Sequence, residues 1–470
     1  MTNPEIHLYN TLSGKKELFK PIKSGAVGIY NCGPTVYSDA HIGNLRAYVF
    51  SDILRRVFEY NDYEVKQVIN ITDVGHLVTD GDDGEDKMTK ALKREGKPLT
   101  LEAMKEVATT YFEHFVRDLK LLNIELPEYF PRASENIPED IEIIKILEKK
   151  EIAYKTSDGV YFDTSKFPGY GKLGNISMKH DDEGTRIAQN MEKKNHADFA
   201  LWKFNKELGW ESPWGKGFPG WHIECSAMSR KYLGQPFDIH TGGTDHIPTH
   251  HNNEIAQSEA AFDKPLANYW LHGEHLVLNN AKIAKSSGNA INLSSLEENK
   301  VSPLAYRYWL LTAHYRSLVN FSLEAVLAAQ NAYIRLVEAF ISFKSDKAGV
   351  IDGNFQDKFK TAINDDLNMP EAIALTWQMI KDHHVSDADK RATLLDFDRV
   401  FGLGLSAVEK LDDSPASIES LPPEVFALLE ARDEARAAKD WQKSDALRLE
   451  IESRGYDVKD TAEGSVLKKK

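Results

Sequence analysis

Two cysteines, one histidine and one glutamate are the residues of this chain whose types and spacing could hold a metal ion. Cys32 and Cys225 are the only cysteines among 470 residues, and His250 and Glu254 lie four positions apart in a predicted helix. Residues four apart project from one face of a helix, and zinc accepts thiolate, imidazole and carboxylate ligands. Each residue also has an ordinary interpretation, because lone cysteines are often inert and buried and His–Glu pairs occur on helix surfaces. A zinc site and four unrelated structural residues are therefore both open alternatives.

The residues around His41 have the pattern of a phosphate-binding turn. An apolar run at residues 26–30 predicts a strand, a Gly-Pro pair ends it, and a helical periodicity begins near Asn44. A helix start offers unpaired N–H groups and the positive end of the helix dipole, so His41 and Asn44 lie where a phosphate would be held. Cys32 lies nine residues before His41. One turn thus combines a phosphate-type helix start with a rare thiol.

The segment F-D-I-H-T-G-G-T-D, residues 237–245, predicts a second ligand-binding strand end. The strand is expected to end at His240. Gly242 and Gly243 allow a ligand to approach the backbone closely, and the carboxylate of Asp245 can accept hydrogen bonds from ribose hydroxyls. This pattern favours a nucleotide at the second strand end.

Two lysines, Lys282 and Lys285, lie three positions apart in the segment K-I-A-K-S-S-G-N. Lysines in a Ser/Gly loop can clamp a polyphosphate, and they can equally form a solvated basic loop. The sequence alone leaves both interpretations open.

Residues 215–220 contain the dinucleotide spacing G-x-G-x-x-G. Prolines flank and interrupt the spacing, at Pro213 and Pro219, and no strand is predicted before it. An ordinary glycine-rich turn is the better interpretation.

The elements that must position these residues are those of a parallel α/β sheet. A strand at 26–30, a helix at 44–59 and a strand at 64–72 form a predicted βαβ unit. Parallel sheets bind ligands at the carboxyl ends of their strands, where Cys32 and Thr72 both fall. Residues 127–195 are predicted to be an insertion between two halves of the sheet. The acidic loop at 80–86 departs from a calcium loop at its fifth position, so we interpret it as solvated.

The second part of the chain is predicted to be mainly helical. Residues 301–405 carry helical patterns typical of a bundle. A polar linker with prolines follows, then a charged pair of helices at 424–454 and a basic tail at Lys468–Lys470.

The overall composition limits the class of protein. No run of 18 apolar residues occurs, and the first residues lack a basic segment followed by an apolar one, so we expect a cytoplasmic protein with no membrane segment. The net charge is −14, from 72 acidic and 58 basic residues. This balance argues against a non-specific coat on nucleic acid, but it is compatible with a structured RNA bound by a locally basic face.

The chain resembles the cysteinyl-tRNA synthetases over nearly its whole length. Seven motifs occur in the order in which that family has them: G-I-Y-N-C-G-P-T-V-Y, A-H-I-G-N, N-I-T-D-V-G-H, G-W-H-I-E-C-S-A-M, F-D-I-H-T-G-G-T-D, H-H-N-N-E and K-I-A-K-S-S-G-N. The later segments I-N-D-D-L-N-M-P and A-K-D-W-Q-K-S-D-A-L-R also match. Together the motifs are highly specific.

The resemblance implies an α/β Rossmann-type parallel-sheet catalytic domain with an insertion, followed by mainly α-helical C-terminal domains. The implied domains are a first catalytic half at 1–125, a connective insertion at 126–200, a second catalytic half with the metal ligands at 201–270, a stem-contact region with the lysine loop at 271–325, a helical bundle for the anticodon side of the tRNA at 326–408, a linker at 409–423 and a small C-terminal domain at 424–470.

The implied reaction is the ATP-dependent attachment of L-cysteine to tRNA(Cys) through a cysteinyl-adenylate. One Zn²⁺ per chain would accept the substrate thiolate directly, and ATP would enter with Mg²⁺ as a substrate. A metal that prefers a thiolate to an alcohol separates cysteine from serine, which an apolar pocket does poorly. The resemblance also favours a monomer.

The family's functional residues carry over to named positions of this chain. The resemblance implies catalytic roles for His41, Asn44, Lys282 and Lys285, of which we expect His41 and Lys285 to stabilise the transition state. It also implies ATP binding by these four residues and by Gly43, Gly242, Gly243, Asp245 and Ser286; cysteine binding by Thr72, Trp221 and His240; and zinc binding by Cys32, Cys225, His250 and Glu254.

Two departures from the family pattern matter. Ile283 and Ala284 stand where the family usually has Met and Ser, so the charge clamp is kept while the packing of the loop differs. Asn44 replaces the last histidine of the general signature and keeps a side-chain donor. Two rivals remain: a cysteine ligase of the mycothiol pathway, which lacks the long helical C-terminal part, and a non-catalytic tRNA-binding paralogue, which would lose its phosphate ligands.

Overall fold

The fold is described from a computed structural model that places residues 5–74, 87–176, 191–220, 222–278, 281–282, 291–343, 347–408, 422–461 and 464–469. The chain divides into two compact units, Met1–Leu405 and Ser406–Lys470. The acidic loop at 80–86 and residues 409–421 of the predicted linker lie outside the described residues.

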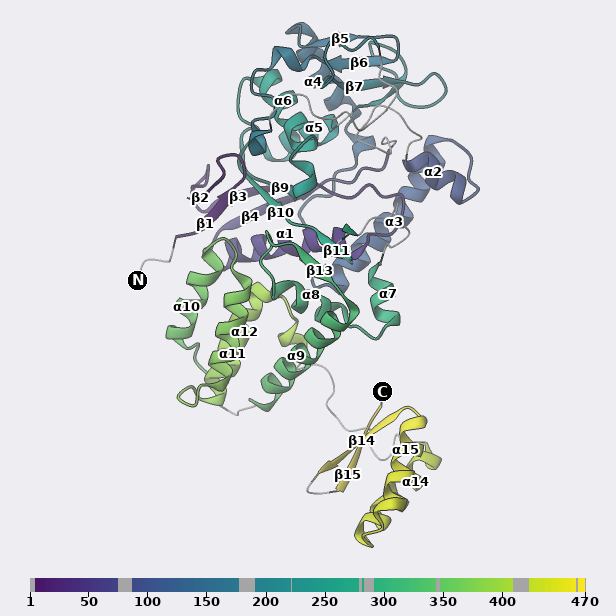
Figure 1. Cartoon of the computed structure of the whole chain (residues 1–470), viewed down its shortest axis with the longest axis vertical. Coiled ribbons are helices and arrows are strands. Elements are labelled where there is room, and N and C mark those ends of the chain that lie inside the picture. Colours follow the sequence, from purple (N-terminus) through teal and green to yellow (C-terminus); the bar gives the residue numbers. More distant parts are fainter. Residues whose placement is uncertain are drawn as a thin grey trace. The chain divides into compact units, whose positions relative to one another are not determined.

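A parallel sheet with strand order β10-β9-β3-β4 lies at the middle of the first unit (Figure 1). Its strands are β3 (Ala26–Asn31), β4 (Glu64–Ile69), β9 (Phe237–Gly243) and β10 (Ala267–Gly273). Asn31 pairs with Thr241 on one side and with Ile69 on the other, so the carboxyl ends of three strands meet at one edge. The Rossmann-type parallel sheet is therefore confirmed, although β4 ends three residues before the predicted end at 72.

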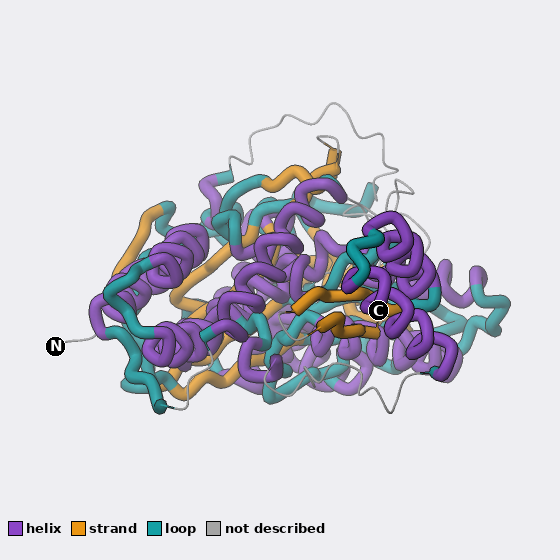
Figure 2. The backbone as a smooth tube through the Cα atoms, turned by 90° about the horizontal axis from the view of Figure 1, so that it is seen from below, coloured by secondary structure: helices purple, strands orange, loops and turns teal. Residues whose placement is uncertain are grey.

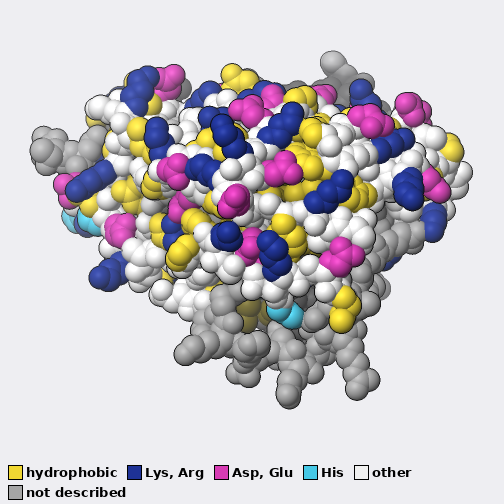
Figure 3. Space-filling model, turned by 90° about the horizontal axis from the view of Figure 1, so that it is seen from above, with side chains coloured by type: hydrophobic (Ala, Val, Ile, Leu, Met, Phe, Trp, Pro, Cys, Tyr) yellow, Lys and Arg dark blue, Asp and Glu magenta, His cyan; other side chains and the backbone are white. Residues whose placement is uncertain are grey.

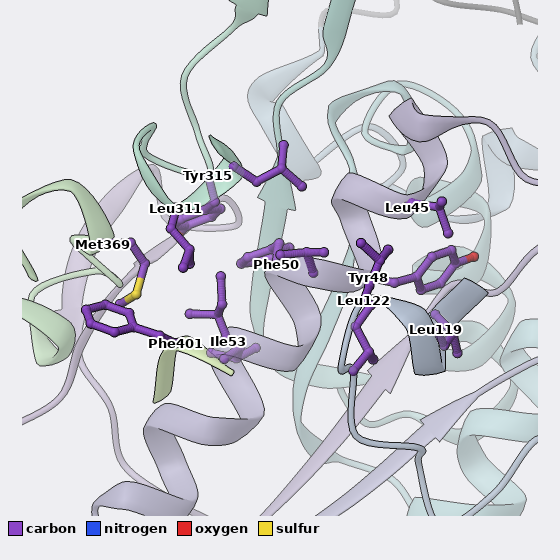
Figure 4. Packing of buried hydrophobic residues seen from close by; sticks show 14 of the residues in the cluster. Leu45, Tyr48, Phe50, Ile53, Leu119, Leu122, Leu311, Tyr315, Met369 and Phe401 are labelled. Carbon is purple, nitrogen blue, oxygen red and sulfur yellow. The ribbon is translucent and has the colours of Figure 1, made fainter. Parts of the chain in front are cut away.

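Helix α1 (Ile42–Tyr60) connects β3 to β4 and is buried on most of its surface. Apolar residues occupy more than one of its faces, which is the pattern of a core helix. Figure 4 shows Leu45, Tyr48, Phe50 and Ile53 of α1 packing against residues of other elements, among them Leu119, Leu122, Leu311, Tyr315, Met369 and Phe401. Helix α1 thus holds the sheet and the helical part in one hydrophobic core.

A second, antiparallel sheet forms most of the insertion, with strand order β5-β6-β7-β8. It comprises β5 (Ala153–Lys155), β6 (Gly159–Phe162), β7 (Phe199–Phe204) and β8 (Gly217–Pro219), and it follows helix α4 (Ile137–Lys149). The predicted domain boundary at residue 200 falls inside β7, so this sheet continues to Pro219. The glycine-rich segment at 215–220 supplies β8, which agrees with rejecting a dinucleotide loop there.

The remaining elements of the first unit are mostly helices, as predicted for the second part of the chain. The helices are α2 (Lys87–Arg94), α3 (Leu101–Leu121), α5 (Ile223–Leu233), α6 (His250–Phe262), α7 (Leu293–Glu298), α8 (Pro303–Leu311), α9 (Leu323–Ser342), α10 (Gly353–Asn364), α11 (Met369–Lys381) and α12 (Asp387–Phe401), and α13 (Leu405–Val408) crosses the boundary between the units. The short strands are β1 (His7–Asn10), β2 (Lys15–Leu18), β11 (Leu276–Leu278), β12 (Ala281–Lys282) and β13 (Val319–Phe321). Figure 2 shows helices lying over the strands on the side seen from below.

The second unit pairs two helices with a hairpin. Its elements are α14 (Pro423–Ala437), α15 (Trp441–Ser453), β14 (Tyr456–Thr461) and β15 (Gly464–Lys469). The predicted basic tail is wrong for Lys468 and Lys469, because both belong to β15, which pairs with β14. The buried side chains of Val458 in β14 and Leu467 in β15 belong to the core of this unit. The hairpin therefore packs one of its faces against the core.

Charge is mixed on the face of the molecule shown in Figure 3, where basic and acidic side chains alternate without gathering into one patch. Of the helices that the structure describes, none combines the length and the apolar character that crossing a membrane requires.

Candidate functional site

The site lies at the carboxyl edge of the parallel sheet. Cys32 follows β3 directly, and its N–H donates to the carbonyl of Thr241 in β9 at 3.2 Å. Gly33 is required at the next position, because a Cβ there would lie 1.5 Å from the carbonyl oxygen of Asn70. The turn therefore fixes the Cys32 backbone against two neighbouring strands.

Helices α5 and α6 bring three further side chains to Cys32. Cys225 lies in the first turn of α5, and His250 and Glu254 lie on α6, with 3.0 Å between His250 Nε2 and Glu254 Oε1. Cys32 Sγ lies 3.5 Å from His250 Nε2 and 3.8 Å from Glu254 Oε1. One ligand atom from each of these four residues falls within 4.8 Å of the others. The four residues that the sequence left as separate possibilities thus converge on one point.

A second set of four donors shares two of these residues. Cys32, His240, His251 and Glu254 also offer ligand atoms within 4.8 Å of one another. In that set His240 Nε2 contacts Glu254 Oε2 at 2.9 Å, and His251 Nδ1 contacts His272 Nε2 at 2.8 Å. Contacts of this kind are typical of residues that orient the ligands of a metal from outside the first coordination sphere. If Cys32, Cys225, His250 and Glu254 are the ligands, His240 lies outside them and orients the Glu254 carboxylate.

The pKa values of the candidate metal ligands shift in different directions within the cluster. Burial alone would raise the pKa of the Cys32 thiol, but the Cys225 thiol and the imidazoles of His250 and His251 hold this pKa well below its usual range. The hydrogen bond to Cys32 and burial raise the pKa of the Cys225 thiol. Burial opposes the charged form of His250, yet Cys32 and Glu254 raise the pKa of its imidazole well above its usual value. A cation that replaced the protons of this cluster would find its ligands already gathered.

A pocket of about 600 Å³ opens beside the cluster. Cys32 and His41 both line it, and so do the glycines at 242 and 243 together with Asp245. Cys32, alone among the four predicted metal ligands, therefore shares one cavity with residues of two distant segments that are predicted to bind phosphate and ribose.

His41 is the N-cap of α1 and is held by a reciprocal capping box. The backbone N–H of Asn44 donates to His41 Nδ1 at 3.1 Å, and the N–H of His41 donates to Asn44 Oδ1 at 3.3 Å. Because a backbone N–H can only donate, Nδ1 accepts, and the ring proton of the neutral imidazole is on Nε2. His41 can therefore donate a hydrogen bond from Nε2.

The start of α1 is less open than a bare helix end. The N–H of Ile42 donates to the carbonyl of Ile291 at 2.8 Å, and the N–H of Asn44 is used in the capping box. A Cβ at Gly43 would lie 3.0 Å from His41 Nδ1, so glycine leaves room for the imidazole. Two of the first three N–H groups of α1 are therefore already used, and the His41 ring adds a donor at this turn.

The glycine pair on β9 is a requirement of packing. A Cβ at Gly242 would lie 2.5 Å from His246 Nδ1, and one at Gly243 would lie 2.3 Å from Asp245 Oδ1. Larger residues would displace these side chains from the pocket.

The predicted cysteine-binding residues occupy different places. Thr72 lies behind the pocket wall, where its backbone pairs with Pro34 and Val36. His240 is completely buried beside Glu254. Trp221, Lys285 and Ser286 lie outside the described residues, and of Lys282 only the backbone is described, in β12.

The sequence interpretation missed three histidines beside the metal-ligand cluster. His251 Nε2 lies 3.3 Å from Cys32 Sγ, and His272 Nδ1 continues the chain to Thr11 Oγ1 at 2.8 Å. His246 stacks on His250 with 4.6 Å between ring centroids. The clustering of histidines at 240–251 was the available signal, but His272 on a different strand had none.

Solved structures share the fold of the chain at low sequence identity. Methionyl-tRNA synthetase of Mycobacterium tuberculosis in complex with methionyl-adenylate aligns with a TM-score of 0.57 and 13% identity, covering 87% of this chain and 94% of that structure. A LeuRS–tRNA–LeuAMS ternary complex from Agrobacterium radiobacter aligns with a TM-score of 0.58 and 11% identity, covering 84% and 86%. These two comparisons establish the fold alone.

Sequence comparison identifies the family. The model of the tRNA synthetases class I (C) catalytic domain matches residues 18–331, and that of the cysteinyl-tRNA ligase anticodon binding domain matches residues 419–465. Cysteine–tRNA ligase 1 of Burkholderia lata is 47% identical over 468 residues, covering 98% of this chain and 96% of that protein. Cysteine–tRNA ligase of Treponema denticola is 42% identical over 496 residues, covering 99% of each. With both family models matched in order and such relatives aligned from end to end, the chain belongs to the cysteine–tRNA ligase family of class I aminoacyl-tRNA synthetases.

Proposed function

We propose that this chain attaches L-cysteine to tRNA(Cys) at the expense of ATP, and that it selects cysteine through a zinc ion held by Cys32, Cys225, His250 and Glu254. The observation that carries the proposal is the convergence of these four side chains beside the pocket that His41 lines. Family membership supports the reaction class, and the geometry supports the residues.

The donor set fits zinc. Two sulfur atoms, one imidazole nitrogen and one carboxylate oxygen are ligands that zinc binds, and Glu254 and Cys225 are almost completely buried. The second carboxylate oxygen of Glu254 is held by His240, so the carboxylate has a fixed orientation. When both thiols and the carboxylate are ionised, they bring negative charges to one point, which a divalent cation would offset. These residues would hold the ion.

Such a zinc ion would supply a strong preference for a thiolate over an alcohol. Cysteine and serine differ only in sulfur against oxygen, which an apolar pocket discriminates weakly. Selection at the metal would give specificity in the first step without an editing site.

In adenylate formation, the carboxylate of cysteine attacks the α-phosphorus of ATP and pyrophosphate leaves. The carboxylate is already ionised, so the chain needs no general base. His41 donates from Nε2 to a phosphate oxygen and stabilises the charge that develops there, and its Nδ1 is fixed by the N–H of Asn44. Asp245 accepts from the ribose, and the backbone at Gly242–Gly243 lies against the nucleotide. Lys282, Lys285 and Ser286 close over the leaving pyrophosphate, with Mg²⁺ accompanying ATP.

In the second step, a hydroxyl of the terminal adenosine of tRNA(Cys) attacks the activated carbonyl and AMP leaves. We assign binding of the anticodon side of the tRNA to the bundle at 326–408 and the domain at 424–470, and contact with the stem to residues 271–325. We infer a cytoplasmic monomer.

Thr72 and His240 act on cysteine indirectly, Thr72 through the wall at 34–36 and His240 through Glu254.

The test is cysteine-dependent ATP–pyrophosphate exchange, with the zinc content measured on the same sample. We expect about one zinc per chain and exchange with cysteine that exceeds exchange with serine by at least about a thousandfold. Cys225→Ser should lose zinc and cysteine selectivity together.

Ser229→Ala, at another buried position of α5, is the matched control and should keep both properties. Zinc-loaded wild-type protein without exchange would contradict the reaction. Full selectivity in protein without zinc would contradict the metal's role.

A further inference from the structure

Helix α2 presents a basic face beside the pocket. Lys87, Lys90 and Arg94 lie three and four positions apart, so they share one side of the helix. Met88, Ala91 and Leu92 are buried on another side, which fixes the orientation of α2. The chain as a whole carries a net charge of −14, so a basic face at this position is not a consequence of overall composition.

Two residues of this face reach the pocket itself. Lys87 and Lys90 line the cavity that also contains Cys32 and His41. Of the lysines that the structure describes, these two alone line it. Lys90 is exposed, and the described residues offer it no ion pair or hydrogen bond. The remaining basic chain in the wall, Arg46, is buried and donates to the carbonyls of His275 and Ser317 at 2.6 Å each.

Aromatic rings lie among these lysines. Tyr37 and Tyr111 line the same pocket and are partly exposed. The ammonium of Lys87 lies 6.0 Å from the centroid of the Tyr37 ring, and the guanidinium of Arg94 lies 5.6 Å from that of Tyr111. Rings interleaved with cations are typical of surfaces that bind single-stranded nucleic acid, because bases stack on the rings and phosphates meet the cations.

Arg94 fixes the two tyrosines relative to α2. Its Nη2 donates to the Tyr37 carbonyl at 2.8 Å and to the Tyr111 hydroxyl at 2.9 Å. The Tyr111 hydroxyl in turn donates to Glu95 Oε1 at 2.9 Å. Arg94 is therefore a positioning residue, and Lys90 is the basic side chain of this face to which the described residues offer no ion pair or hydrogen bond.

We propose that Lys87 and Lys90 of α2, with the rings of Tyr37 and Tyr111, bind the single-stranded 3′ end of the tRNA as it enters the pocket. The ammonium groups bind backbone phosphates, and the rings offer stacking surfaces for unpaired bases. The proposal rests on the proposed function, because the terminal adenosine must reach the adenylate in this pocket. ATP is assigned to His41, Gly242, Gly243 and Asp245. The side of the pocket formed by α2 is therefore available to the tRNA.

The test compares two reactions of the full-length enzyme. Lys90→Met should lower kcat/KM for aminoacylation with respect to tRNA about fivefold to tenfold more than it lowers ATP–pyrophosphate exchange, since exchange requires no tRNA. The slope of log KM for tRNA against log salt concentration should also become shallower by about 0.7, the value for one lost phosphate contact on a single strand. Lys90→Arg should restore most of the aminoacylation, because it restores the charge.

Lys93→Met is the matched control. Lys93 is exposed on the same helix and does not line the pocket, so both reactions should stay within about twofold of wild type. If Lys93→Met lost as much aminoacylation efficiency as Lys90→Met, the effect would come from the overall charge of the enzyme, and the proposed site would be contradicted. A raised KM for ATP in the exchange reaction of Lys90→Met would assign the lysine to ATP instead, and no effect in either reaction would also overturn the proposal. Absence of exchange in the wild type would contradict the proposed function and not this surface.

Discussion

At the scale of single residues, Asp140 shows how burial sets the charge of a side chain away from the pocket. Its side chain on α4 is completely buried, and neither carboxylate oxygen has a hydrogen-bond partner among the described residues. Burial, followed by the carboxylates of Glu224 and Glu139, raises the pKa of Asp140 well above its usual value, and Lys231 opposes this only in part. Asp140 is therefore a neutral acid in the folded chain over a pH range in which it is ionised in the unfolded chain.

The stability of the wild type relative to Asp140→Asn should therefore fall as pH rises. Between the ordinary aspartate pKa and the raised folded pKa, the folded chain binds one proton more than the unfolded chain, so its free energy of unfolding decreases by about 1.4 kcal/mol per pH unit. Asparagine removes this term. Urea unfolding of zinc-loaded protein from pH 5 to 8 measures the widening gap.

Asp263→Asn, at a side chain that is 83% exposed, is the control and should stay within about 0.5 kcal/mol of wild type. A constant difference between wild type and Asp140→Asn across the pH range would mean that Asp140 is ionised in the folded state.

Residue types indicated much of the site, and their surroundings could not be read from the sequence. The spacing of His250 and Glu254 predicted that both project from one face of a helix, and in the structure both lie on α6 with 3.0 Å between Nε2 and Oε1. The contact between His240 and Glu254 could not be predicted from the sequence, because it depends on how β9 packs against α6. The sequence did not indicate a role for His272, because its contact with His251 joins strand β10 to helix α6.

At the scale of elements, α1 connects the turn at His41 to the helical part of the first unit. Its N-cap is His41, and its third turn carries Asp52, which is completely buried with Arg307 of α8. Arg307 Nη2 lies 2.5 Å from Asp52 Oδ2, and its Nε donates to the Phe401 carbonyl at 2.6 Å. One arginine thus ties α8 to α1 and to the end of α12.

Arg307→Met should destabilise the first unit by about 3–5 kcal/mol, because it removes the donor to the buried carbonyls of Phe401 and Leu122 and one of the two arginines that hold Asp52, which keeps only Arg56. The midpoint of urea unfolding measures the loss. Arg399→Met is the control: Arg399 pairs with Asp396 at 3.3 Å, but its side chain is 58% exposed, so we expect a loss below about 1 kcal/mol. Equal losses in the two variants would refute the connecting role of Arg307.

The elements themselves followed from periodicity and turn chemistry. The apolar pattern and the Gly-Pro break predicted β3, the turn and α1 closely. The predicted basic tail was wrong because the pairing of β15 with β14 is a backbone contact that composition does not indicate. The extent of the insertion's sheet was likewise set by the pairing of β7 with β6 and β8.

At the scale of the whole molecule, the meeting of Cys32, Cys225, His250 and Glu254 depends on the order of the strands in the sheet. Cys32 and the α5–α6 residues are separated by some two hundred positions and by the inserted sheet, and they meet because β9 lies beside β3. Spacing in the sequence cannot give that order. The family resemblance did predict that the four residues meet, because the order of the motifs identifies a family whose fold brings them together.

The central claim is that both thiols bind one zinc ion, and X-ray absorption at the zinc edge tests it most directly. We predict about one zinc per chain with two sulfur neighbours at about 2.3 Å and two lighter ligands at about 2.0–2.2 Å. The alternative set of Cys32, His240, His251 and Glu254 would give one sulfur and two nitrogens. A single sulfur neighbour, or purified protein without zinc, would contradict the account.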